Sequence, residues 1–206
     1  MEVTKLFFTT LFAAFVGVIP PGLVNMTVAK TCLEKGKKSG VVVAIGASII
    51  VFCQAMLAIL LAKYIFRHPD VQQNLLRVGL LVFIGLGVYF FLQARKTNHH
   101  TKKTKQTSAF SLVKGMTIAG LNVFPIPYFV TISAVFSGDQ CCNFSWASII
   151  AFSLAAAIGT FTTLYLYVYF FAKINDKTAV IAKYANYFMA VLMLMLVFIT
   201  FLRLYI

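Results

Sequence analysis

Charged residues divide this chain into six long uncharged stretches, and no other feature limits its fold more. Only 11% of the 206 residues are charged, whereas 61% are hydrophobic. A helix needs about 20 mostly apolar residues to span a bilayer, and it satisfies its backbone hydrogen bonds internally, as lipid requires. The uncharged stretches are residues 6–29, 39–62, 78–94, 115–138, 140–172 and 184–202. They predict an all-α, polytopic membrane protein with six transmembrane helices.

The basic residues fall mainly on one side of these predicted spans. Of the 18 Lys and Arg residues, thirteen lie in the first, third and fifth loops and five on the opposite side. The positive-inside rule therefore places the odd-numbered loops in the cytoplasm and both termini outside. The basic segment 95–105 is expected to lie against anionic lipid headgroups. It contains no aromatic residues, so nucleic acid is not an expected partner.

The order of the spans predicts two halves. Residues 1–94 supply three spans, residues 95–111 form a basic cytoplasmic connector, and residues 112–206 supply three more spans. Because three is odd, the second half must enter the membrane from the opposite side to the first. The expected architecture is therefore a 3+3 inverted repeat, which is common among transporters.

Helix-breaking residues interrupt the first span of each half. Under a shift of 105 residues, Pro20 aligns with Pro125 and Gly22 with Pro127. A proline removes one helical N–H and clashes with the carbonyl one turn earlier. Two breaks at matched depth predict a midplane cavity, where N–H groups of the half-helices hold a carboxylate and freed carbonyls hold an ammonium group. The alternative is that the kinks serve helix packing alone.

Polar and helix-breaking residues around these breaks are the candidate ligands. Polar groups inside a membrane are expensive and usually face a cavity or a partner helix. The predicted substrate-binding residues are Pro21, Gly22, Asn25, Gln54, Asn122, Pro125, Pro127 and Tyr128, with Thr27 and Thr131 as further candidates. For Gln54, a hydrogen bond that joins two helices is the alternative role.

Two groups in the fifth span have a structural interpretation. Thr160, Thr162 and Thr163 can hydrogen-bond their own helix backbone. The tyrosines at every second position from 165 to 169 are scattered around a helix. We therefore expect these tyrosines to form an interfacial aromatic belt rather than a binding face.

Side chains suited to catalysis or metal binding are missing from all six stretches, which contain no Asp, Glu, Lys, Arg or His. No catalytic residue, metal site or cofactor is therefore predicted, and the chain is not expected to be an enzyme. The cysteines are Cys32, Cys53 and the adjacent pair Cys141 and Cys142. Their spacing matches neither a CxxC redox motif nor a zinc site.

Spaced glycines and prolines recur in a definite order. Pro21 and Gly22 lie in the first span, Gly36, Gly40 and Gly46 follow in the basic loop and the start of the second span, and the fourth span carries Gly115 and Asn122. In this order the chain resembles the LysE/RhtB family of amino-acid exporters over most of its length. Leu23 and Val123 stand where that family has prolines. Val51 stands where many members have an acid, so proton coupling and cationic substrates are not implied.

The resemblance implies a bacterial inner-membrane exporter of amino acids or similar small zwitterions. Such a protein would rock its two halves around the midplane site, with a small-molecule substrate as its main partner and a homodimer as one assembly. Two other functions stay open. A divalent-cation exporter needs ligands at membrane depth, and only Cys53 qualifies. A membrane thiol-redox protein would use the cysteines instead.

Overall fold

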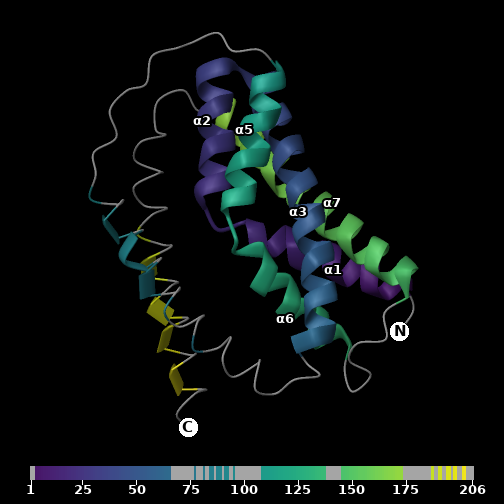
Figure 1. Cartoon of the computed structure of the whole chain (residues 1–206). Helices are drawn as coiled ribbons and strands as arrows, with labels where there is room; N and C mark the ends of the chain where they lie inside the picture. Colours follow the sequence, from purple (N-terminus) through teal and green to yellow (C-terminus); the bar gives the residue numbers. More distant parts are fainter. Residues whose placement is uncertain are drawn as a thin grey trace.

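Every element that the computed structural model describes is an α-helix, which confirms the all-α class (Figure 1). The described residues are 3–65, 108–137 and 145–173, with scattered positions in 77–95 and 187–202. The helices are α1 (Val3–Val18), α2 (Leu23–Lys35), α3 (Lys37–Ile65), α5 (Ser108–Leu121), α6 (Pro125–Ser137) and α7 (Trp146–Phe171).

Among these residues, α3 and α7 are each long and apolar enough to cross a membrane. Two bent helix pairs, α1 with α2 and α5 with α6, bring the number of candidate spans to four if each pair counts as one. Most of the predicted spans 78–94 and 184–202, most of the connector and the Cys141–Cys142 pair lie outside the described residues. The six-span count and the domain boundaries stay predictions.

The first predicted span is interrupted at its prolines. α1 and α2 meet at 70°, because Pro20 and Pro21 have no N–H to donate to the carbonyls one turn earlier. The N–H of Ile19 bonds the Val16 carbonyl at 3.1 Å instead and closes α1. α2 then continues through the expected basic loop and ends at Gly36, whose φ of +88° suits glycine.

The second bent pair is built in the same way but in a different register. α5 and α6 meet at 65°, and Pro125 is the first residue of α6, where a missing N–H is tolerated. The ends of α1 and α5 are 103 residues apart, and the starts of α2 and α6 are 102 apart. Pro125 therefore corresponds to Leu23 in the structure, rather than to Pro20 as the sequence alignment predicts.

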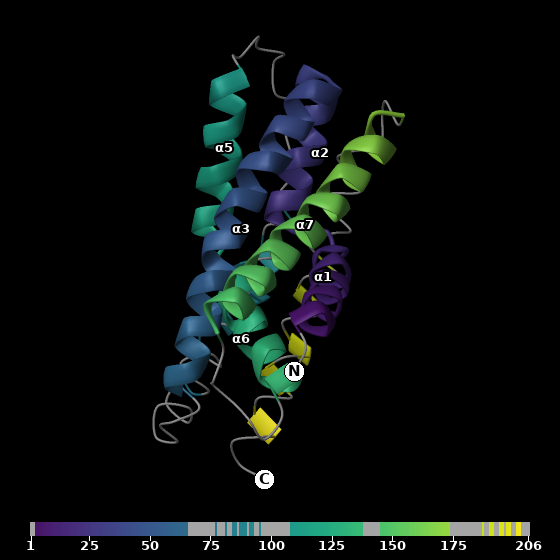
Figure 2. The ribbon, with the colours of Figure 1, turned by 90° about the vertical axis from the view of Figure 1, so that its right-hand side faces the viewer.

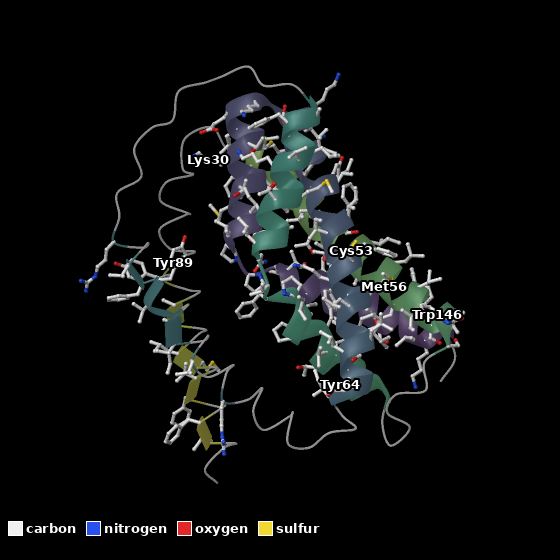
Figure 3. The ribbon with its side chains drawn as sticks, in the orientation of Figure 1. Lys30, Cys53, Met56, Tyr64, Tyr89 and Trp146 are labelled. Atoms are coloured by element: carbon white, nitrogen blue, oxygen red, sulfur yellow. The ribbon has the colours of Figure 1, made fainter. Side chains whose placement is uncertain are left out.

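The helices pack in an interlocked order rather than as two separate halves. Figure 2 shows α5, α3, α7 and α1 side by side across one face. α1 packs on α7, and α5 packs on α3, so the first helix of each half lies on the long helix of the other half. Lys30 lies at one end of the molecule, and Tyr64 and Trp146 lie at the other (Figure 3).

Two glycines allow these helix pairs to approach closely. A Cβ at Gly46 of α3 would overlap the Leu112 carbonyl of α5, and it would lie 3.2 Å from the Met116 nitrogen. A Cβ at Gly159 of α7 would lie 2.5 Å from the Leu11 oxygen and 3.0 Å from the Phe15 nitrogen of α1. Leu11 and Leu112 are 101 residues apart, as are Phe15 and Met116. The two crossings are therefore built from corresponding positions.

Two apolar clusters form the core, one toward each end of the molecule. The first combines residues of α1, the second half of α3, α6 and the first half of α7, and includes Phe129 and Phe152. The second combines α2, the first half of α3, α5 and the end of α7, and includes Val43 and Leu164. Both helix breaks lie where the bent pairs pass from one cluster to the other, so their polar groups are at mid-depth.

Candidate substrate site at the two helix breaks

The first break is stabilised locally by Asn25. Its side-chain nitrogen donates to the carbonyls of Val18, at 2.5 Å, and of Pro20, at 3.0 Å. Asn25 is itself buried, at 4% exposed, and its two bonds give these carbonyls the donor that no described backbone N–H supplies. The structure thus uses the amide donors of this predicted ligand to hold the break in place.

Helix α7 caps the same break from the other half of the chain. Thr163 donates to the Phe15 carbonyl at 2.8 Å, and Tyr167 donates to the Ile19 carbonyl at 2.7 Å. Sequence reasoning assigned neither side chain to the break. The sequence pattern that could have identified them is the four-residue spacing of Gly159, Thr163 and Tyr167, which places all three on one face of a helix.

The second break is capped from α3 by Gln54, which is 8% exposed. Its side-chain nitrogen donates to the carbonyls of Ala119, at 3.1 Å, and of Asn122, at 2.8 Å. The Gln54 side-chain oxygen has no partner among the described residues. The side-chain oxygen of Asn122 accepts from the N–H of Phe124 at 3.4 Å. Gln54 therefore joins two helices, which was the alternative role, and it does so at the break.

The two caps occupy matching positions on the long helices. Gln54 comes eight residues after the crossing glycine Gly46, and Tyr167 comes eight residues after the crossing glycine Gly159. Eight residues are about two helical turns, so the glycine and the donor share one face. Each long helix thus meets the other half at a glycine and caps that half's break two turns later.

The N-terminus of α2 is open. Gly22 is its N-cap and makes no side-chain bond, and the N–H of Met26 is the first to close a helical bond, to Gly22 at 2.9 Å. The N–H groups of Leu23, Val24 and Asn25 have no acceptor among the described residues. Three free N–H groups at the positive end of a helix dipole suit an anion.

Two carbonyls of the first break are also unpaired within the described part of the chain, those of Gly17 and Pro21. The helical partner of the Gly17 carbonyl would be the nitrogen at position 21, which is a proline and carries no hydrogen. Free carbonyl oxygens suit a cation such as an ammonium group. The first break therefore presents donors and acceptors together.

The N-terminus of α6 is closed, contrary to the expectation that both half-helices offer N–H groups. Pro125 and Pro127 carry no N–H. The N–H groups of Ile126 and Tyr128 are bonded to carbonyls about one turn earlier, at 3.2 and 3.4 Å. The first turn of α6 thus has no donor left for an anion.

Two side-chain hydrogen bonds join the bent pairs, one on each side of the breaks. Tyr128 of α6 donates to the Ala13 carbonyl of α1 at 2.7 Å, and a Cβ at Gly17 would lie 2.6 Å from the Tyr128 oxygen. Lys114 of α5 donates to Thr31 of α2 at 3.0 Å. The structure brings Tyr128 to the first break, although its own helix begins at the second.

The remaining candidates are placed less favourably. Thr27 donates to the Leu23 carbonyl at 2.7 Å and Thr131 to the Pro127 carbonyl at 3.0 Å, so both hydroxyl groups bond their own helix. Cys53 is exposed on α3 (Figure 3). Within the described ranges, no three His, Cys, Asp or Glu residues are grouped so that they could hold a metal ion.

Comparison with known proteins gives one match. The sequence model of the family described as LysE type translocator matches residues 15–203, which include both breaks, both crossing glycines and both long helices. No curated protein and no solved structure matches the chain significantly. The match covers most of the chain. The chain therefore belongs to the LysE type translocator family, a family of membrane transporters.

Proposed function

We propose that the chain exports amino acids or similar small zwitterions and that the first break binds the substrate carboxylate. The observation that carries this proposal is the open N-terminus of α2, where the N–H groups of Leu23, Val24 and Asn25 meet no acceptor in the part of the chain that the structure describes. In a low-dielectric setting, such groups are unfavourable without an anion or water to bond. A substrate carboxylate would supply the missing acceptors.

The unpaired carbonyls of Gly17 and Pro21 are the proposed partners of the substrate ammonium group. Both lie within a few residues of the free N–H groups, so one small molecule with both charges could use both sets. Tyr128 packs against Gly17 and would form a wall of the site. The second break contributes this wall and supports α6, and it does not bind the carboxylate.

We further infer that the two halves form an inverted repeat. The matched glycine crossings at Gly46 and Gly159, and the matched caps by Gln54 and Tyr167, support this inference. The packing disfavours rocking of residues 1–94 against 112–206 as rigid bodies, because such a motion would separate both glycine crossings.

Alternating access is instead proposed to move the α1–α2 pair relative to the α5–α6 pair. The Tyr128–Ala13 and Lys114–Thr31 bonds join these pairs on opposite sides of the breaks. Breaking one bond while keeping the other would expose the first break to one side only. The protein is proposed to lie in a bacterial inner membrane, with the Lys114–Thr31 bond on the predicted cytoplasmic side.

The test removes the N–H group of residue 23. Gly22 has φ −120° and ψ −174°, an extended conformation that suits a residue before proline, and position 23 is the first of the helix, where proline is favoured. Leu23→Pro should therefore fold and lose one hydrogen bond to a charged group, worth about 1.5–3 kcal/mol. Leu23→Ala is the matched control, since it shortens the side chain and keeps the N–H.

The measurement is export of a radiolabelled amino-acid mixture from loaded proteoliposomes. Leu23→Pro should raise KM roughly tenfold or more, while Leu23→Ala should stay near the unsubstituted protein. Equal KM values for the two variants would refute the carboxylate site. No export by the unsubstituted protein, compared with empty liposomes, would refute the substrate class.

A further inference from the structure

A groove of about 430 Å³ runs between α3 and α7, away from the helix breaks. Its walls are apolar, with Ile45, Ile49 and Phe52 on one side and Leu154, Ile158 on the other. Ser48 also lines the groove, but its hydroxyl donates to the Ala44 carbonyl of its own helix at 2.9 Å. The groove therefore has the chemistry of a slot for a hydrocarbon chain.

Two lysines lie at one end of the same two helices. The Lys37 ammonium is 5.8 and 5.9 Å from the ring centres of Tyr165 and Tyr169. The Lys173 ammonium donates to the Tyr169 hydroxyl at 2.9 Å and lies 4.5 Å from the centre of that ring. In the part of the chain that the structure describes, no carboxylate pairs with either lysine. Two cations thus converge on the Tyr169 ring, and no described carboxylate accompanies them.

Two neighbouring aromatic rings connect the groove to the lysine pair. Phe161, which lines the groove, has its ring centre 6.1 Å from that of Tyr165, which lies beneath Lys37. Lys37 and Phe52 are fifteen residues apart on α3, or about 22 Å along a helix. One leaflet of a bilayer, headgroup included, is about 20–22 Å thick. The charged end and the apolar slot therefore have the spacing of one lipid molecule.

We propose that this surface binds an anionic phospholipid, with its phosphate between Lys37 and Lys173 and one acyl chain in the groove. Basic residues near the membrane surface attract anionic lipids, and the tyrosine hydroxyl adds a hydrogen-bonding group. A second copy of this chain would cover the slot but would leave the two cations unpaired. The site is independent of the substrate site at the first break.

A tryptophan placed in the groove tests the proposal. The protein carries Trp146→Phe, which removes its one tryptophan, and Phe161→Trp, and is reconstituted in phosphatidylcholine vesicles. The quenching of the fluorescence of this tryptophan is then compared between brominated phosphatidylglycerol and brominated phosphatidylcholine. We expect a preference of about thirtyfold for phosphatidylglycerol, because each of the two lysines contributes an attraction of about one kcal/mol. This preference should weaken as salt is raised.

The charge-neutral variants Lys37→Gln and Lys173→Gln, combined, should bring the preference close to one. Lys38→Gln is the matched control, because Lys38 is a neighbouring exposed lysine on α3 for which no contact with these rings is described. Native mass spectrometry of the unsubstituted protein should retain phosphatidylglycerol over phosphatidylcholine, so the test does not depend on the tryptophan variant folding.

Three outcomes would overturn the proposal. One is an unsubstituted protein that retains both lipids equally, and another is a preference that survives the double lysine substitution. The third is efficient disulfide formation between two copies of Ser48→Cys without quenching by either brominated lipid, which would assign the groove to a second copy of the chain.

Discussion

The two helix breaks occupy corresponding places in the two halves and differ in chemistry. At the first break, α2 begins at Leu23 with three N–H groups that have no acceptor among the described residues. At the second, α6 begins at Pro125, and its first turn has no free N–H group. Both breaks have their carbonyls capped by the long helix of the opposite half, through Tyr167 and Gln54.

The difference follows from where the prolines lie relative to the start of the helix. Pro20 and Pro21 lie before α2 and remove donors to the end of α1, so they leave the N–H groups of α2 intact. Pro125 and Pro127 lie inside the first turn of α6 and remove its own N–H groups. A displacement of a few residues thus decides whether a broken helix can bind an anion.

The largest expected effect tests whether the two helix crossings, at Gly46 and at Gly159, are equivalent. Gly46→Val and Gly159→Val each force a side chain into the backbone of the neighbouring helix, which cannot give way as a flexible side chain can. We expect each to destabilise the fold by about 3 kcal/mol or more. Thermal unfolding in detergent, followed by size-exclusion chromatography, measures this loss.

The control for both crossings is Gly120→Val. A Cβ at Gly120 meets no atom of the described residues within 4 Å, so this variant should unfold close to the temperature of the unsubstituted protein. If only one of the two crossing variants were destabilised, the helices would not meet at equivalent places, and the proposed repeat would lose its main support.

The next largest effect compares the two side chains that cap the breaks, Gln54 and Tyr167. Gln54→Leu removes two hydrogen bonds and leaves the Asn122 carbonyl without a donor, while the Ala119 carbonyl keeps the Asn122 N–H; Tyr167→Phe removes one hydrogen bond. We expect losses of about 2 and about 1 kcal/mol in the free energy of unfolding. Comparison of the two variants with Thr131→Val, whose hydroxyl bonds its own helix, gives the background. A loss for Tyr167→Phe no larger than for Thr131→Val would show that α7 does not cap the first break.

The smallest effect concerns the two bonds that join the bent pairs. Tyr128→Phe and Lys114→Met should each lower the apparent KM about fivefold on the side that they open, because one lost bond of about 1 kcal/mol shifts the population of open states by that factor. The two variants should act on opposite faces of oriented proteoliposomes. Effects on the same face would contradict the assignment of two gates.

The sequence predicted the main helices well because their signal is strong. Long uncharged runs predict α3 and α7 directly, and paired prolines predict both breaks. The register of the second break was not predictable, because Pro125 is compatible both with a gap and with the first position of a helix. Only the path of the backbone distinguishes these two placements.

The sequence predicted which polar side chains lie at the breaks, but it did not predict which groups they bond. Asn25, Gln54 and Asn122 were expected at the breaks and do lie there, but sequence alone does not show which carbonyls they bond. Tyr167 was expected in an aromatic belt. Its contact with Ile19 spans 148 residues of sequence, and a contact of that length leaves no local pattern.

The inequality of the two breaks is tested most directly by NMR of backbone amides. The protein, labelled at selected residue types, is titrated with an amino acid that it exports. We predict saturable shifts for the amides of Leu23, Val24 and Asn25, with those of Ile126 and Tyr128 little changed. Shifts of equal size at both breaks, or at Ile126 and Tyr128 alone, would contradict this prediction.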